Sequence, residues 1–318
     1  MIDQICARCG GLLTTSEAEP YCGACDPRVI DEPAPEESTA GFAAPDAMEG
    51  EPISEEALGG GPVYRPDPDS PAWGVTAAIG VWLFSFAAIF VMPLLVVGVM
   101  LGIRSASGNP LPTAAGEMEQ LLTSPSYLLA QVAATYPAHL LTIAVCWGVV
   151  TGFKKRPFLD SLGWQWEGLP LIAKTMLVPA VCIGVFALSV ILEKILPNKH
   201  DTPFEQMVTS STHIRYAVAA LAVFTAPFVE EFVYRGVLYA ALRRRIGVWA
   251  AVAVVTVLFA GVHVPQYLGA WAAIASLLAL SLILTLFRAV TKSIKPCIAI
   301  HILFNAVQAV FLVFTAGK

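Results

Sequence analysis

The sequence divides into a polar N-terminal part and a long part in which apolar runs alternate with short polar loops. These runs begin after residue 70 and lie at about 73–101, 127–152, 169–196, 216–242, 248–264, 268–287 and 296–316. A helix needs about 20 residues to cross the hydrocarbon core of a bilayer, and most of the runs reach that length. The fifth run is short and ends at Pro265. The pattern predicts an all-α, polytopic membrane helix bundle of about seven spans.

The composition agrees with a membrane protein. Of the 318 residues, 56% are hydrophobic and 14% are charged, which excludes an ordinary soluble globular domain. Residues 1–70 carry three basic and 15 acidic side chains, whereas residues 71–318 carry 16 basic and nine acidic ones. We expect the lipid bilayer as a partner and no nucleic-acid partner, and the sequence leaves the oligomeric state open.

The basic residues of the membrane part cluster in every second loop, at 154–156, at 243–245 and at 288–295. Cytoplasmic loops of membrane proteins carry an excess of Lys and Arg. The alternation therefore predicts a multi-pass protein of the plasma membrane, with its N-terminus in the cytoplasm and its C-terminus outside.

Four cysteines near the N-terminus form two C-x-x-C pairs, Cys6 with Cys9 and Cys22 with Cys25. Two such pairs at this separation can supply four thiolates to one tetrahedral zinc ion. Because residues 1–27 are too few to bury a core, the metal would supply the folding energy of a small zinc ribbon. Two disulfides or a redox pair are the alternatives, and the predicted cytoplasmic location favours structural Zn²⁺ because that compartment keeps thiols reduced.

The segment from residue 28 to residue 70 is rich in Pro, Glu, Asp, Ala and Gly. Such a composition buries too little apolar surface to offset the entropy lost on ordering the chain. We therefore expect three parts: a zinc ribbon at 1–27, a disordered, acidic linker at 28–70 and a membrane-embedded domain at 71–318.

Three ionisable residues, Glu230, Glu231 and Arg235, interrupt the fourth apolar run. Placing a charge in the membrane costs roughly 2.5–3.5 kcal/mol per group even on a lenient scale. Glu231 and Arg235 are four residues apart and can pair on one helix face, whereas Glu230 points about 100° away from its neighbour. We expect one carboxylate to be neutralised by the arginine and the other to face something else. The alternative is a buried ion cluster that only fixes helix packing.

Two further polar insertions occur later in the chain, Phe259-x-x-x-His263 at the end of the fifth run and His301-x-x-x-Asn305 in the seventh. An intramembrane histidine usually marks a relay, a ligand or a catalytic group, although each could form only a bond between helices. Three polar insertions on nearby spans together predict one shared cavity. His139, alone in the second run, is expected to be a hydrogen-bonded bundle histidine.

The three patterns resemble the motifs of the CAAX protease and bacteriocin-processing (CPBP or Abi) family. All three are complete and in the family's order, and the resemblance covers about residues 160–316. It implies an intramembrane, glutamate-dependent endopeptidase that needs no metal for catalysis. The site residues that it implies are Glu230 as the catalytic carboxylate, His263, His301 and Asn305 beside it, and Glu231 and Arg235 as its support.

The chemistry expected of this site is the attack of an activated water on a peptide bond. Glu230, together with His263, would deprotonate the water. His301 and Asn305 would then donate hydrogen bonds to the oxyanion. The substrate would be a membrane-associated protein or peptide, and the resemblance allows it to be lipidated.

Other functions stay open on the sequence alone. They are a zinc-dependent version of the hydrolysis with Glu230, His263 and His301 as ligands, a non-proteolytic bacteriocin-immunity or chaperone-like membrane protein, and a proton-relaying transporter. The depth of the residues in the membrane also raises a question. Counting about 1.5 Å per residue from the cytoplasmic ends of the helices places His301 closer to the cytoplasmic surface than Glu230. Either the seventh helix begins before Pro296 or the helices tilt strongly.

Overall fold

The structure, a computed structural model, describes residues 66–168, 170–197 and 201–315. The predicted zinc ribbon, with Cys6, Cys9, Cys22 and Cys25, lies outside these ranges, as does nearly all of the predicted linker. Within the described ranges the regular structure consists of helices and contains no strand. The predicted all-α fold is therefore confirmed.

Six helical segments are long and apolar enough to cross a bilayer. They are Val75–Ala106, Pro125–Thr151, Leu171–Ile195, Thr212–Ile246, Trp271–Thr291 and Lys295–Phe314. The fifth predicted span is present as a shorter apolar helix of 16 residues, Val248–His263. At 1.5 Å per residue this helix is about 24 Å long, less than the roughly 30 Å of a hydrocarbon core. The number and order of the apolar helices match the predicted multi-pass bundle.

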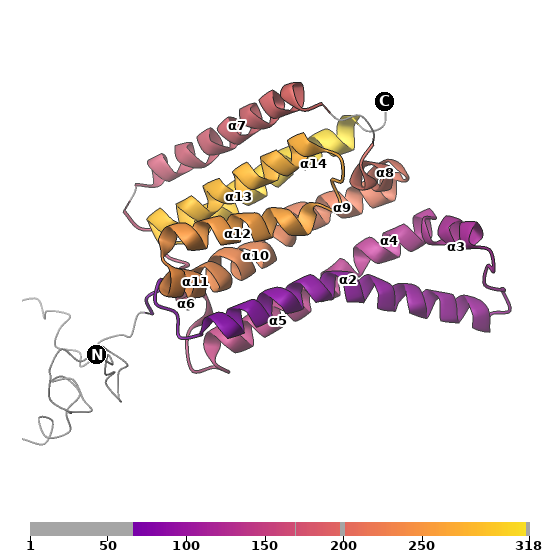
Figure 1. Cartoon of the computed structure of the whole chain (residues 1–318), viewed down its shortest axis with the longest axis horizontal. Coiled ribbons are helices and arrows are strands. Elements are labelled where there is room, and N and C mark those ends of the chain that lie inside the picture. Colours follow the sequence, from indigo (N-terminus) through magenta and orange to yellow (C-terminus); the bar gives the residue numbers. More distant parts are fainter. Residues whose placement is uncertain (1–65, 169, 198–200, 316–318) are drawn as a thin grey trace, which may run out of the picture. The chain divides into compact units, whose positions relative to one another are not determined.

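Figure 1 shows how these helices are arranged. The main helices are α2 (Val75–Ala106), α4 (Pro125–Ala133), α5 (Thr135–Thr151), α7 (Leu171–Ile195), α9 (Thr212–Phe224), α10 (Ala226–Glu231), the π-helix η2 (Phe232–Leu238), α11 (Tyr239–Ile246), α12 (Val248–His263), α13 (Trp271–Thr291) and α14 (Lys295–Thr315). Short helices α3 (Ala115–Leu122), α6 (Phe158–Ser161) and α8 (Pro203–Thr209) connect them.

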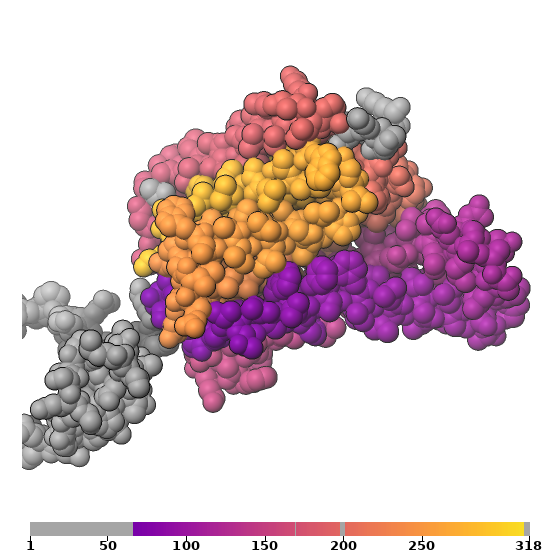
Figure 2. All heavy atoms as spheres, viewed as in Figure 1, coloured from indigo at the N-terminus to yellow at the C-terminus, as the bar shows by residue number. Residues whose placement is uncertain are grey.

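The fourth long segment, α9 to α11, lies between the other helices. Helices α2 and α5 pack on η2 from one side, α12 packs on η2 and α11, and α14 packs on α9 and α10. Helix α7 contacts α13 and α14. All seven residues of η2 are buried. By contrast α2, indigo in Figure 2, carries large apolar side chains that are exposed, including Leu83, Leu94 and Leu95. An apolar outer surface of this kind fits contact with lipid.

The fourth segment is not a regular α-helix. It breaks at Thr225, whose φ of −123° and ψ of −45° end α9, and Pro227 follows in the first turn of α10. Proline interrupts a helix because it lacks an N–H and its ring clashes with the preceding turn. Immediately after Glu231 the chain winds as a π-helix from Phe232 to Leu238. Such stretches are rare and occur often at functional sites, and the hydrophobic pattern alone predicts an unbroken span here.

Residues 66–73, which we call the strap, are held against the helix ends. The Asp69 carboxylate, whose side chain is 6% exposed, pairs with Arg288 at 2.9 Å and also contacts Arg243. Arg288 further donates to the Pro68 carbonyl over 2.8 Å. The Trp73 indole N–H donates to the carbonyl of Val237 in η2 over 3.1 Å. The strap therefore fixes the start of α2 to α13 and to η2.

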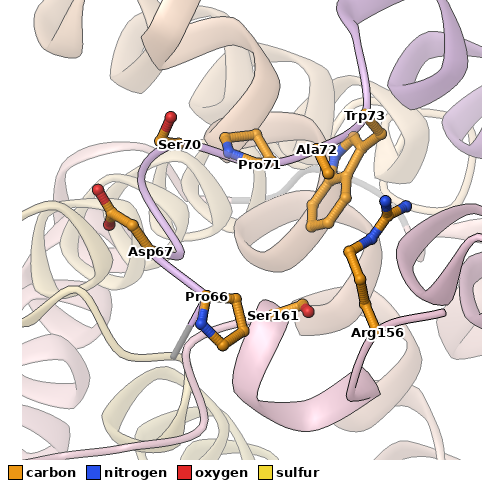
Figure 3. Close-up of a pocket in the computed structure, with 8 residues that line it drawn as sticks. All are labelled: Pro66, Asp67, Ser70, Pro71, Ala72, Trp73, Arg156 and Ser161. Carbon is orange, nitrogen blue, oxygen red and sulfur yellow. The ribbon is translucent and has the colours of Figure 1, made fainter. Parts of the chain in front are cut away.

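A small pocket lies beside the strap (Figure 3). It is lined by Pro66, Asp67, Ser70, Pro71, Ala72, Trp73, Arg156 and Ser161. None of these residues belongs to the three sequence motifs. The pocket is therefore separate from the site described next.

Candidate functional site

The centre of the site is His301, near the start of α14, which contacts two glutamates at the end of α10. A carboxylate can only accept, so the His301 Nδ1–H donates to Oε1 of Glu231 over 2.8 Å. The other ring nitrogen, Nε2, lies 3.7 Å from Oε2 of Glu230. His301 thus bridges the two carboxylates, and the imidazole is 4% exposed. The structure brings together two of the three motifs here.

The two neighbouring glutamates have different surroundings. Glu231 pairs with Arg235 at 2.9 Å, and both side chains are completely buried. Glu230 points elsewhere and keeps 22% of its side chain exposed. The predicted pairing of Glu231 with Arg235 is confirmed, and so is the expectation that the other carboxylate would be left facing a different environment.

Arg235 is held from its far side by α13, a helix that supplies none of the motif residues. Its Nη2 donates to Oγ of Ser281 over 2.8 Å and to the Ser281 carbonyl over 3.1 Å. Its Nε donates to Oγ1 of Thr285 over 3.3 Å. Ser281 and Thr285 were not singled out from the sequence. The signal available was their spacing, because two hydroxyl residues four apart in an apolar span share one helix face.

Phe259, the first residue of the second motif, packs against three of the polar groups. Its ring lies 5.0 Å from the ring of His263, 5.9 Å from that of His301 and 4.6 Å from the guanidinium carbon of Arg235. A guanidinium over an aromatic face gains cation–π attraction, most of all when it is shielded from water. The Phe259 ring therefore packs against both histidines and the arginine, and it forms the apolar surface that they share.

His263, at the end of α12, has a defined tautomer. Its Nδ1 lies 2.8 Å from the carbonyl oxygen of Phe259. A carbonyl can only accept, so Nδ1 carries the proton and Nε2 of the neutral ring keeps a lone pair. Half-buried at the end of its helix, the ring offers a proton-accepting nitrogen to its surroundings.

Asn305 faces α9 in this structure. Its Nδ2 donates to the Ala222 carbonyl over 2.8 Å, which ties α14 to the turn before the Thr225 break. A carboxamide has two N–H groups, so the bond to Ala222 uses one of them. The oxyanion role expected from the sequence would need the second.

The charge of Glu230 acts on two residues outside the motifs, His139 and Tyr267. His139 is hydrogen-bonded, as predicted, with its Nδ1 3.0 Å from Oγ1 of Thr225, and the charge of Glu230 reaches its ring. Tyr267 lies in the turn that follows His263. Burial raises the pKa of Tyr267 to about 12, and the negative charges of Glu205 and Glu230 act in the same direction. This turn therefore also lies within reach of the Glu230 charge.

Among the described side chains, no group of three or more His, Cys, Asp or Glu is arranged to hold a metal ion. The cysteines Cys146, Cys182 and Cys297 are free and buried.

The structure shows at which level of the helix bundle His301 lies relative to the two glutamates. Helix α14 begins at Lys295, one residue before Pro296. His301 contacts both Glu230 and Glu231. Its imidazole therefore lies at the same level as the two carboxylates, whatever the count of residues from the helix end suggests.

The fold and the site together define a polytopic helical membrane protein with carboxylates, imidazoles and a guanidinium gathered inside it. Residues 212–307 match the family model described as Rce1-like, type II CAAX prenyl endopeptidase. The matched range contains all three motifs and supports the CAAX protease family, which points to a membrane protease activity of the CAAX type. No match was found among curated proteins, and none among solved structures.

Proposed function

We propose that this protein is an intramembrane endopeptidase in which Glu230 activates water to hydrolyse a peptide bond. The observation that carries the proposal is the difference between the two adjacent glutamates. Glu231 is buried and neutralised by Arg235, whereas Glu230 is partly exposed and has the imidazole of His301 3.7 Å away. A carboxylate that is close to an imidazole and open to water is suited to be a general base.

In the proposed reaction Glu230 takes a proton from water as the water oxygen attacks the scissile carbonyl carbon. His263 assists by accepting a hydrogen bond at its free Nε2, which its bond to Phe259 leaves available. When the C–N bond breaks, the proton held by Glu230 passes to the leaving nitrogen, and the site returns to its starting state. Glu231 and Arg235 stay paired throughout.

The oxyanion of the tetrahedral intermediate would face His301. Its Nδ1 is committed to Glu231, so only Nε2 can donate to the substrate, and it can do so only when the ring is protonated. The two glutamates provide the negative charge that balances such an imidazolium. The second N–H of Asn305 would be the other donor.

We propose a peptide bond near the end of a membrane-associated protein or peptide as the substrate. The family that matches is one of CAAX prenyl endopeptidases, so a prenylated C-terminal peptide is the first substrate to test. An unprenylated peptide of the same sequence is the matched comparison. Cleavage of only the prenylated peptide would assign the lipid a role in recognition.

The test of the proposed activity is a comparison of protein termini in membranes of cells that express different variants. We expect new termini with the wild type and none with Glu230→Gln, which keeps the shape of the side chain but cannot accept the proton. Glu193→Gln, at an exposed carboxylate of α7, is the control and should give the wild-type termini. Identical termini with Glu230→Gln at equal expression would overturn the proposal.

We also propose a structural zinc ion bound by Cys6, Cys9, Cys22 and Cys25, and a cytoplasmic N-terminus. The sequence spacing of the cysteines supports the first and the distribution of basic loops supports the second. Labelling of single introduced cysteines with a membrane-impermeant reagent tests the orientation. We expect labelling from outside in the turn at 264–269 and protection in the loop at 152–157, and the reverse pattern would contradict it.

A further inference from the structure

Helix α13 contributes two hydroxyl side chains to the site although no motif residue lies on it. Ser281 and Thr285 are one helical turn apart, and each is completely buried. Hydroxyl groups are rarely buried in a lipid-embedded helix without a polar partner. Here the partner is Arg235, which donates hydrogen bonds to both hydroxyl oxygens.

The two hydroxyls and one carbonyl fix the plane of the guanidinium. The Thr285 hydroxyl donates to the Ser281 carbonyl over 2.7 Å, so its proton is used there and its lone pairs face Arg235. Nε of Arg235 then donates to Thr285, and Nη2 donates to Oγ and to the carbonyl of Ser281. A planar guanidinium with acceptors on two of its nitrogens has little freedom to rotate.

The third nitrogen of this guanidinium points at the centre of the site. Nη1 of Arg235 donates to Oε1 of Glu231 over 2.9 Å. The same carboxylate oxygen accepts from His301 Nδ1 over 2.8 Å. A continuous chain of hydrogen bonds therefore runs from α13 through Arg235 and Glu231 to the imidazole that faces Glu230. Within such a chain the position of each group depends on the groups behind it.

We propose that Ser281 and Thr285 are positioning residues that orient His301 through Arg235 and Glu231. The proposal rests on the proposed function, because it assigns these hydroxyls a part in the same reaction. Without them Arg235 keeps its charge and its bond to the Ser281 carbonyl but loses the two hydroxyl acceptors that help to fix its plane. Glu231 can then rotate with the guanidinium, and Nε2 of His301 is no longer held at one place beside Glu230.

The test measures kcat and KM separately, on a peptide that contains a cleavage site found with the wild type. We expect Ser281→Ala and Thr285→Val to lower kcat by about 10-fold or more with KM little changed, as loss of groups that orient a reacting residue does. Ser281→Thr and Thr285→Ser keep the hydroxyls and should recover most of the rate. Ser276→Ala, on the same helix but half-buried, is the matched control and should behave like the wild type.

A purely structural role would lower thermal stability in Ser281→Ala and Thr285→Val but leave kcat of the folded protein unchanged. Folding is checked by thermal melting and by gel filtration in detergent, and Ser281→Cys replaces Ser281→Ala if that variant does not fold, because sulfur is a weak acceptor. A wild-type kcat in folded Ser281→Ala and Thr285→Val, with activity still lost in Glu230→Gln, would overturn the positioning role alone. Cleavage that persists in Glu230→Gln would instead overturn the proposed function, and this inference with it.

Discussion

At the scale of single residues, the site depends on two adjacent glutamates with different environments. Successive residues of a helix point about 100° apart, so Glu231 meets Arg235 and the buried side of α14 while Glu230 keeps an exposed surface. The chain therefore places a buried carboxylate that is paired with an arginine beside one that is partly exposed. Substitution of each glutamate should have a different effect.

The prediction for the pair compares Glu230→Gln with Glu231→Gln. Glu231→Gln leaves the buried Arg235 without its counter-charge, and removal of one partner of a buried ion pair costs about 3–5 kcal/mol of stability. We expect a clear drop in melting temperature for Glu231→Gln and little change for Glu230→Gln, whose side chain is partly exposed. The measurement is thermal melting in detergent, followed by tryptophan fluorescence. Equal melting temperatures for Glu230→Gln and Glu231→Gln would contradict a stabilising role of the Glu231–Arg235 pair.

A second residue-scale prediction concerns pH and Tyr267. Its pKa is raised from 10 to about 12 by burial and by nearby carboxylates. The folded protein therefore holds this proton where the unfolded chain has lost it, and the stability that results is complete below pH 10 and is lost as the pH rises through 12. In Tyr267→Phe we expect a smaller loss of melting temperature between pH 10 and pH 12.

The comparison for this pH effect is Tyr216→Phe. Tyr216 is 56% exposed and should keep the wild-type decrease. Equal slopes of melting temperature against pH for Tyr267→Phe and the wild type would show that Tyr267 does not titrate in this way.

At the scale of elements, polar contacts between side chains and backbone join helices whose outer surfaces are largely apolar. The π-helix η2 is held by Trp73, whose indole bonds Val237, and by Trp82, whose indole N–H donates to the Tyr234 hydroxyl over 3.1 Å. Both tryptophans lie outside the range of the family match. The first helix and the strap before it therefore belong physically to the core that carries the motifs.

The strap gives the element-scale prediction. Asp69 is the carboxylate partner of Arg288, whose side chain is completely buried, so Asp69→Ala leaves a buried guanidinium without its counter-charge. We expect a loss of about 3–5 kcal/mol, measured as a lower melting temperature. Asp69→Asn, which keeps an acceptor for Arg288, should lose less. Glu119→Ala, at an exposed carboxylate of α3 outside the strap, is the control, and a drop in melting temperature for it as large as that for Asp69→Ala would contradict the role of Asp69.

At the scale of the whole molecule, the membrane part and the N-terminal cysteine segment are predicted to fold by different means. The first buries apolar helices against one another and exposes large apolar side chains on its outer surface. The second would depend on a metal, because so few residues cannot bury a core. The two parts should therefore respond differently to removal of zinc.

We predict about one zinc ion per full-length chain, bound by the four N-terminal cysteines. The double substitution of Cys6 and Cys9 by serine should remove the ion without lowering the melting temperature of the membrane part. The control is the double substitution of Cys146 and Cys182 by serine, which should keep the zinc. The zinc content per chain is measured by mass spectrometry of metals in the purified protein. Zinc retained by the Cys6 and Cys9 variant would contradict the prediction that these cysteines bind it.

The hydrophobic pattern determined the number, order and approximate bounds of the apolar helices, because the need to span a bilayer acts on each stretch of chain separately. It also determined the pairing of Glu231 with Arg235, because residues four apart meet on any helix. The π-helical winding of η2 could not be derived in this way, since it departs from the regular period that the pattern assumes.

Contacts between distant segments were decided only by the tertiary structure. His301 meets Glu231 across 70 residues, and Arg235 meets Ser281 across 46. The side chain of Asn305 turns to the carbonyl of Ala222. Such contacts depend on how helices rotate and shift against each other, and that is set by the packing of the whole bundle. The sequence thus determined which polar groups enter the membrane, and the packing decided which of them touch.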